Sequence, residues 1–475
     1  MSSALAPAST PTDNAQLRGW TLALVSMASF MMALDAMVVT TALGRIRDEL
    51  SAPMGLLQWA VNAYNLSFGV LLITGAALGD RFGRRRVMSL GIGIFVVASV
   101  ACATATGIGA LIAARALQGA GAALVMPLAM AILGATYSRE LRARALGIFG
   151  SVTGLALILG PAVGGAVAQG LDWPWIFWIN VPIGILLIAL MRRHIPESRG
   201  AAAGLDYPGL LLATASAGGM VWALMRGHQA GWTSPEIAFA LAVGLLCAAG
   251  FLLAEQRVSA PMVPLHLFAR RDLAAGTSAG FLFYASLYAT VFFLPQYFQM
   301  NGAGPFVAGL ELLPFTATLF VVAPMAGKLV KRFGERKLVT VGVLLQAIGL
   351  GWLAMIAGPF LAYVATVPAL IVAGVGISLA MPAAQNAVIG AVAPVDIGKA
   401  SGVFNMARYL GGVFGVALLV EVFSSVGGTD SPQMFSSGFS RAMAGASVLA
   451  LLGAFAGAYL TPMRRPEAAT PRAGA

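Results

Sequence analysis

Long apolar runs separated by short polar loops dominate this chain of 475 residues. A helix needs about 20 apolar residues to cross a bilayer, and about fourteen such runs can be counted, which predicts an all-α membrane protein. Charged residues make up 10% of the chain, against about 25% in soluble domains. The runs lie at 20–43, 57–78, 87–105, 108–133, 145–168, 175–191, 208–225, 237–254, 273–298, 305–329, 338–356, 361–388, 402–422 and 442–460.

Basic residues in the loops predict the orientation of these spans. With the N-terminus in the cytoplasm, the inner loops would carry the clusters at 81–86, 139–144, 192–199, 257–271 and 328–337. Lysine and arginine favour the cytoplasmic side, so we expect an even number of spans in the cell (inner) membrane and both termini inside. This pattern also explains the net charge of +11 without a nucleic-acid partner. The opposite loops hold only Arg45, Arg47, Arg226 and Arg441.

A short repeat predicts how the spans are grouped. Arg-Phe-Gly occurs at 81–83 after the second run and again at 332–334 after the tenth. Two related helix bundles with an inserted helix pair would give this spacing, and parallel repeats are a known transporter architecture. We therefore expect a leader at 1–19, an N-terminal six-helix bundle at 20–200, two inserted helices at 201–260, a C-terminal bundle at 261–462 and a tail at 463–475.

Cysteine and histidine are too few to indicate a metal site or an enzyme. Cys102 and Cys247 lie inside apolar runs, far apart, and the chain has three histidines. These numbers fit neither a disulfide framework nor a metal-ligand cluster. No nucleotide-binding loop is visible, so we expect no metal, no catalytic residues and no cofactor.

The loop at 79–86 reads GDRFGRRR. Its glycines permit a tight turn, and Asp80 can accept hydrogen bonds from an arginine or a helix N-terminus. A simpler interpretation is a positive anchor at the membrane surface. The residue order resembles the loop signature of the major facilitator superfamily, which implies that Gly79, Asp80, Arg81, Gly83 and Arg84 latch the two halves in the outward-facing state. Ala76 stands where that family has glycine, next to Gly75.

Further motifs resemble the fourteen-helix drug–proton antiporters of that superfamily. Residues 111–121 are similar to the fourth-helix motif with its buried arginine, 173–184 to the start of the sixth helix, and 206–209 and 398–402 to later segments. The fifth-helix motif peculiar to antiporters is matched by Gly150, Gly154, Gly160, Pro161, Gly164 and Gly165. Independently of the family, glycines four apart let helices pack closely, so a plain packing seam is the alternative. The resemblance covers about 34–419 and implies the major facilitator fold: two six-helix bundles around a central cavity, plus two inserted helices.

Three charges inside the predicted spans are candidates for proton coupling. Asp35, Arg115 and Glu311 fall at a similar depth if each helix rises about 1.5 Å per residue. Intramembrane charges are costly and usually face a partner or a cavity. Burial favours a neutral carboxyl group and a nearby arginine favours the charged one, so Asp35 and Glu311 could act as a proton switch. Alternatively, Asp35 is a structural anchor and Glu311 is wetted near the surface. Arg408, near an inner span end, is expected to reach the headgroups.

Aromatic residues crowd the ninth span. Phe281, Tyr284 and Tyr288 share one helix face at i, i+3 and i+7. With Gln118 of the fourth-helix motif, Tyr284 and Tyr288 are candidates for the substrate cavity, where ring faces accept cations. Packing and lipid contact are equally good explanations of this face.

The resemblance implies a proton-coupled exporter of small lipophilic, often cationic, drugs that works by alternating access. Its expected partners are small molecules, protons and membrane lipids, and we expect a monomer. The alternatives are a dedicated exporter of one metabolite or self-made antibiotic and an uptake symporter. The fifth-helix motif argues against the symporter.

Overall fold

The computed structural model is helical throughout the residues it describes, which are 15–137, 139–200, 206–258, 261–392 and 396–462. Fourteen helical stretches within these ranges are long and apolar enough to cross a membrane. The predicted leader up to residue 14 and the predicted tail lie outside the described residues. The elements are α1 Ala15–Leu50, α2 Met54–Phe82, α3 Arg84–Ala103, α4 Ile108–Thr136, α5 Arg139–Gly170, α6 Trp175–Trp178, α7 Asn180–His194, α8 Tyr207–Ala230, α9 Pro235–Glu255, the 3-10 helix η1 Leu265–Ala269, α10 Arg271–Met300, α11 Pro305–Glu311, α12 Leu313–Thr316, α13 Thr318–Phe333, α14 Glu335–Ile356, α15 Tyr363–Gly390, α16 Ile397–Ser424 and α17 Pro432–Ala458.

Local sequence signals explain where several helices begin. Proline is the first or second residue of α8, α9 and α17, whose capping side chains Asp206, Ser234 and Ser431 accept hydrogen bonds from backbone N–H groups. Proline suits the first turn of a helix because its missing N–H has no intrahelical partner there. Between α2 and α3, Gly83 has φ 109°, a backbone conformation that favours glycine.

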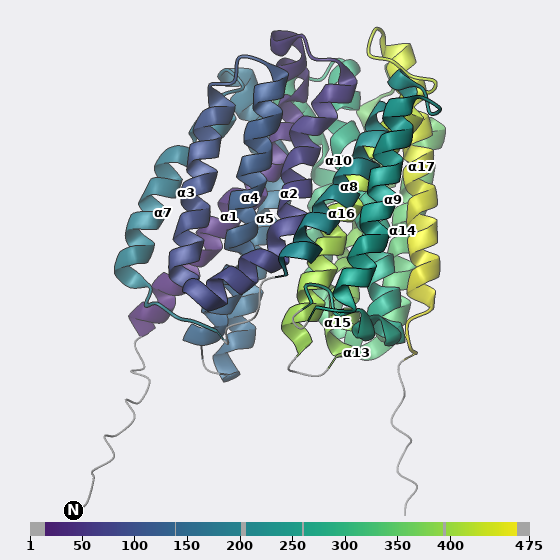
Figure 1. The fold of residues 1–475 in the computed structure, drawn as a ribbon. Coiled ribbons are helices and arrows are strands. Elements are labelled where there is room, and N and C mark those ends of the chain that lie inside the picture. Colours follow the sequence, from purple (N-terminus) through teal and green to yellow (C-terminus); the bar gives the residue numbers. More distant parts are fainter. Residues whose placement is uncertain (1–14, 138, 201–205, 259–260, 393–395, 463–475) are drawn as a thin grey trace, which may run out of the picture.

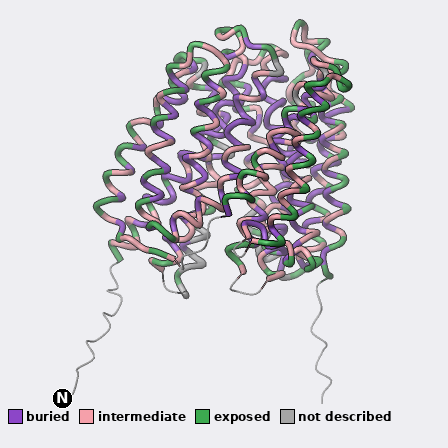
Figure 2. Tube along the Cα trace, viewed as in Figure 1, coloured by how far each residue is buried: buried purple, intermediate pink, exposed green. Residues whose placement is uncertain are grey.

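The helices form two groups side by side, α1–α7 and α10–α17 (Figure 1). We call these the N-terminal and C-terminal halves. Buried residues concentrate where helices face one another, and exposed residues lie on the outer faces (Figure 2). Large apolar residues on those faces, such as Phe239 and Leu246 of α9, are 72% exposed. An exposed apolar face of this kind fits contact with lipid.

The helix pair α8–α9 packs through α8 against both halves. Val221 of α8 is buried with Val413 of α16, and Trp59 of α2 joins this cluster. The ring of Trp222 lies 6.0 Å from that of Trp59. The inserted pair therefore covers the line where α2 meets α16.

Three hydrogen bonds between described residues join the two halves. Gln299 Nε2 donates to the Thr41 carbonyl over 3.0 Å, and Asn62 Nδ2 donates to the Val413 carbonyl over 3.5 Å. The third runs between α11 and α5, where the Phe306 N–H donates to Gln169 Oε1. All three lie toward the end of the bundle away from the start of α1 and the end of α17, both of which are at the lower end in Figure 1. The structure is therefore closed at the end away from the start of α1.

Candidate proton and substrate site

A buried ion pair lies in the middle of the N-terminal half. Arg115 Nη1 on α4 donates to Asp35 Oδ2 on α1, and both side chains are 1% exposed. Asp35 Oδ1 accepts two more hydrogen bonds, from Gln118 Nε2 at 3.1 Å and from Asn180 Nδ2 of α7 at 2.8 Å. Three donors on two helices therefore surround the Asp35 carboxyl group.

Arg115 uses most of its donors in the same cluster. Its Nε donates to the Ala60 carbonyl of α2 over 2.9 Å, and Nη1 also donates to Gln118 Oε1 over 2.7 Å. The guanidinium lies 4.4 Å from the ring centre of Tyr64 and 5.8 Å from that of Phe177, which adds cation–π attraction. Breaking a buried pair by removing one charge costs about 3–5 kcal/mol, so this cluster ties helices α1, α2, α4 and α7 together.

Gln118 belongs to this cluster and not to a cavity wall. It follows Arg115 by three residues, so both side chains lie on one face of α4. It is fully buried and also donates to Ser99 of α3 at 2.8 Å. The placement of Gln118 on a substrate cavity is therefore not what the structure shows.

Glu311 stands apart from the ion pair. It is the last residue of α11, partly exposed, and its carbonyl accepts from the Tyr363 hydroxyl over 3.3 Å. No ion pair among the described residues joins it to Arg115 or to any other base. The predicted tenth span continues beyond it, because only the single residues Leu312 and Ala317, both with αR backbone angles, separate α11, α12 and α13. A similar predicted depth in the membrane therefore does not place Glu311 beside Asp35.

The fifth-helix glycines form two packing seams. A β-carbon on Gly160 or Gly164 would overlap α1 at Met37 or at Thr41 and Val38. On another face of α5, a β-carbon on Gly165 would overlap the Pro305 backbone of α11. The same contact is equally close on the α11 side, where a β-carbon on Gly309 would overlap the Pro161 carbonyl of α5. Helix α5 therefore packs closely both within its own half and across to the other half.

Gly150 and Gly154 are not part of either close seam. A β-carbon on Gly150 would have no atom within 4 Å, and one on Gly154 would lie 3.8 Å from Leu319. Their spacing matches the motif, but their packing does not require glycine in this conformation.

The loop between α2 and α3 is held within the N-terminal half. Asp80 accepts from Arg84 Nε and Nη2, each at 2.8 Å, and its carbonyl accepts from the Gly200 N–H. Gly79 packs so closely on Leu128 of α4 that a β-carbon would overlap it. Arg81 points outward over Phe82, 5.4 Å from the ring centre. All of these contacts are to residues of the N-terminal half. In this conformation, therefore, none of them joins the loop to the C-terminal half.

Sequence reasoning missed Glu197, which completes this turn. Its carboxylate accepts the backbone N–H groups of Arg85 and Arg86 at 2.9 and 3.2 Å. A carboxylate at a helix N-terminus is favourable because of the unsatisfied N–H groups there. Gly75, next to Ala76, packs so closely against the Ala123 carbonyl of α4 that a β-carbon would overlap it.

A narrow opening of about 10 Å³ between the halves, enough for a single water molecule, has one charged side chain on its wall. It is lined by Arg408 together with Met37, Tyr284, Leu287, Tyr288, Val291 and Met381. Tyr284 and Tyr288 thus line the opening, as their helix face predicts. The expectation that Arg408 reaches the headgroups is wrong, because α16 begins at Ile397 and places Arg408 roughly 16 Å into the helix.

Asp35 does not face this opening. Met37 lines it, and two residues along a helix correspond to a rotation of about 200°. Asp35 therefore points into the N-terminal half. A proton on Asp35 would act on substrate through helix packing and not by direct contact.

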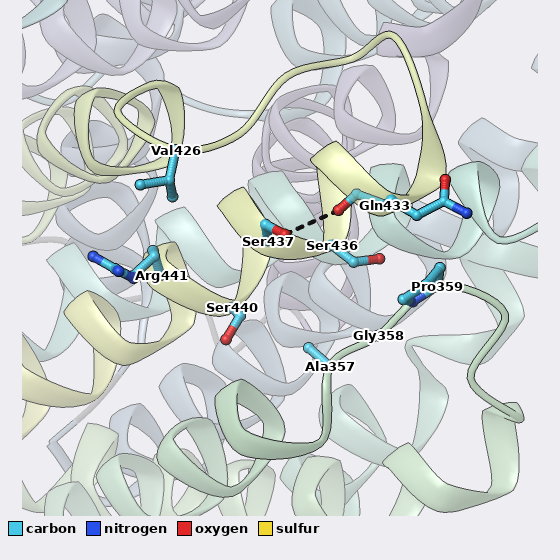
Figure 3. A pocket seen from close by; sticks show the side chains of 9 residues that line it. All are labelled: Ala357, Gly358, Pro359, Val426, Gln433, Ser436, Ser437, Ser440 and Arg441. Atoms are coloured by element: carbon cyan, nitrogen blue, oxygen red, sulfur yellow. Dashed lines mark hydrogen bonds between the residues drawn. The ribbon is translucent and has the colours of Figure 1, made fainter.

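A larger hollow of about 440 Å³ lies at the closed end of the C-terminal half. Figure 3 shows its wall, with Ser436 of α17 pointing toward Pro359 and the Ser437 hydroxyl bonded back to the Gln433 carbonyl of the same helix. Only residues of the C-terminal half line it. It is a polar surface recess and has no connection to the ion pair.

The fold and this arrangement define a transporter: a helical protein with many membrane spans, two halves, an opening between them and a charge cluster buried beside it. The family model of the Major Facilitator Superfamily matches residues 25–416, and the chain belongs to that superfamily. The predicted fold class is confirmed.

Curated relatives cover most of the chain. It is 34% identical over 405 residues to the methylenomycin A resistance protein of Streptomyces coelicolor, covering 84% of this chain and 85% of the relative. It is 35% identical over 451 residues to the cephamycin export protein CmcT of Amycolatopsis lactamdurans, covering 93% and 91%. Identity to the multidrug resistance protein Stp of Mycobacterium tuberculosis is 32%, with coverage of 85% and 76%.

Solved transporters share the fold at low sequence identity. A crystal structure of a POT family transporter with a conjugated peptide has a TM-score of 0.70 at 13% identity, covering 91% of this chain and 94% of that one. A D-xylose–proton symporter gives a TM-score of 0.68 at 15% identity, covering 94% and 98%. These likenesses concern the fold alone.

Proposed function

We propose that this protein exports small lipophilic molecules across the cell membrane in exchange for protons, by alternating access. Both termini would lie in the cytoplasm, and the closed end of the structure would face outward. Relatives named for antibiotic resistance and export support the direction of transport. The protein would work as a monomer among membrane lipids, with protons as its coupling ion and no nucleic acid.

The single observation that carries this proposal is the buried cluster around Asp35. The carboxylate is held by Arg115, Gln118 and Asn180 and is nearly excluded from solvent. Burial favours the neutral acid, and the guanidinium favours the carboxylate. A proton on Asp35 would cancel the ion pair and weaken contacts to α4 and α7 at once, so protonation can bias the packing of the N-terminal half.

The two seams of α5 suggest how that bias reaches the interface. Asp35 lies on α1, Gly160 and Gly164 pack on α1, and Gly165 packs on α11 of the other half. Movement of α1 would therefore press on the contact that closes the outer end. Rocking of parallel repeats around a central site is the expected mechanism for this architecture.

Everted membrane vesicles test the proposal. Cells with and without the protein are first screened for resistance to a panel of lipophilic drugs, and the hits are added to vesicles that hold a preformed proton gradient. Export by exchange predicts that a hit dissipates the gradient and accumulates in the vesicles. Accumulation that ignores an uncoupler would contradict proton coupling. Uptake in the reverse sense would support a symporter.

A dedicated exporter of one compound is the second candidate function. Two relatives carry the name of a single antibiotic each. The same resistance panel separates the candidates, because a dedicated exporter protects against one chemical scaffold and a multidrug exporter against several.

A further inference from the structure

Arg408 is a second arginine within the membrane, and unlike Arg115 it has no acid beside it. It lies in the middle of α16, on the wall of the opening between the halves. No ion pair among the described residues involves it, and its Nε is buried without a hydrogen-bond partner. A guanidinium in a region of low dielectric strongly favours an anion nearby.

Tyrosines take the place of a carboxylate around this side chain. The guanidinium lies 4.8 Å from the ring centre of Tyr284 and 5.3 Å from that of Tyr409, and Tyr288 lines the same opening. Ring faces stabilise a cation, but they leave its full charge in place. The tyrosines therefore orient Arg408 and leave donors for a ligand.

The rest of the opening suits an apolar ligand body. Met37 comes from α1, Leu287 and Val291 from α10, and Met381 from α15. Methionine side chains adapt to varied shapes. When the halves part and widen the opening beyond its present volume of about 10 Å³, this wall can accept a lipophilic molecule whose charged group reaches Arg408.

We propose that Arg408 is the substrate-binding cation of this transporter, and that it selects lipophilic molecules carrying a carboxylate or similar oxyanion. The planar guanidinium donates two parallel hydrogen bonds to such a group. This inference rests on the proposed export function and names its substrate class. It predicts the charge opposite to the cation that the sequence alone suggests.

The surroundings of Arg408 also offer a route to the other half. The ring of Tyr409 lies 4.0 Å from that of Phe68 on α2, and Phe68 stacks on Tyr64 at 6.1 Å. Tyr64 is the ring that packs on Arg115. An anion bound at Arg408 therefore lies at one end of a continuous series of ring contacts that reaches the Asp35 cluster.

Three probes with one fluorophore test the charge preference. Dansylglycine carries a carboxylate, its amide is neutral, and dansyl-ethylenediamine is cationic. Fluorescence titration of the purified full-length protein should give binding of dansylglycine roughly tenfold to a hundredfold tighter than of its amide, as expected for a charge-assisted hydrogen bond. Arg408→Gln should abolish this preference and leave affinity for the amide unchanged.

Two further variants keep the test informative if Arg408→Gln folds poorly. Arg408→Lys keeps the charge but loses the paired donors, so it should retain the preference for the anion in weaker form. Tyr284→Leu removes a ring that packs on the guanidinium, so it should weaken binding of dansylglycine more than binding of the amide. Elution volume and thermal unfolding of each variant control for folding.

The proposal is overturned if dansylglycine does not bind to the wild type, if the cationic probe binds best, or if the anion preference survives Arg408→Gln. None of these results touches the proposed export function. Proton-driven export of a neutral or cationic drug in the vesicle assay would leave that function standing without Arg408 as its selector. If the wild-type protein transported no compound in response to the proton gradient in the vesicle assay, the proposed export function itself would be refuted.

Discussion

Replacing Gly165 by alanine should move the protein away from the conformation described here. The added β-carbon would overlap the Pro305 carbonyl oxygen and lie 2.7 Å from Phe306 Cα. Both obstacles are backbone atoms at the start of α11, so no side-chain rotation relieves them. Overpacking of this kind costs about 1–3 kcal/mol, which corresponds to a shift of about 5- to 150-fold in a two-state equilibrium.

The penalty applies only while α5 and α11 touch. When the outer end opens, those helices separate and the methyl group faces free space, so Gly165→Ala should favour the outward-open state. Spin labels at exposed Leu171 and Phe360, in a background without the native cysteines, should show a longer distance at the outer end. We expect transport to slow because the return step is hindered.

Two alanine substitutions on the same helix are matched controls. Gly164→Ala clashes with α1 inside one half, so it should lower stability without changing the distance between the labels. Gly150→Ala meets no atom within 4 Å and should leave both properties nearly unchanged. An unchanged label distance in folded Gly165→Ala protein would refute the role of this contact in closing the outer end.

Three further predictions concern the loop after α2 and the topology. Asp80→Asn should insert normally but transport poorly, measured by drug accumulation, because the charge that holds Arg84 is gone; wild-type transport would contradict this. Glu197→Gln should lower the free energy of unfolding by about 0.5–2 kcal/mol, seen in denaturant titration, and an unchanged midpoint would count against its capping role. In protein without native cysteines, Arg199→Cys and Ser234→Cys should react with an impermeant thiol reagent from the inside and the outside respectively, and labelling of both from one side would refute the proposed topology.

Span count and fold class followed from the sequence because each depends on a local property. Apolar length marks each span whether or not its neighbours are known, and the motifs of 79–86 and 111–121 add the family. The pairing of Asp35 with Arg115 was open to prediction as well, since a buried arginine needs an acceptor and few acids lie inside the spans.

Other parts of the site depend on which helix faces meet, and local sequence patterns do not determine that. Asn180 is one polar residue at the start of α7, and nothing in its neighbours indicates that it reaches Asp35. Glu197 lies in a polar loop, where a carboxylate carries no signal of the helix it caps. Arg408 was misjudged because the polar residues before Gly402 hid the true start of α16.

Asp35→Asn decides the central claim most directly, because it imitates a permanently protonated carrier of nearly the same shape. In proteoliposomes, the variant should still exchange labelled for unlabelled substrate when no proton gradient is present. It should fail to concentrate substrate when a gradient is imposed, whereas Glu311→Gln should respond to the gradient nearly as the wild type does. If Asp35→Asn still concentrates substrate in proportion to the gradient, the proton is carried elsewhere and the account given for the Asp35 cluster is wrong.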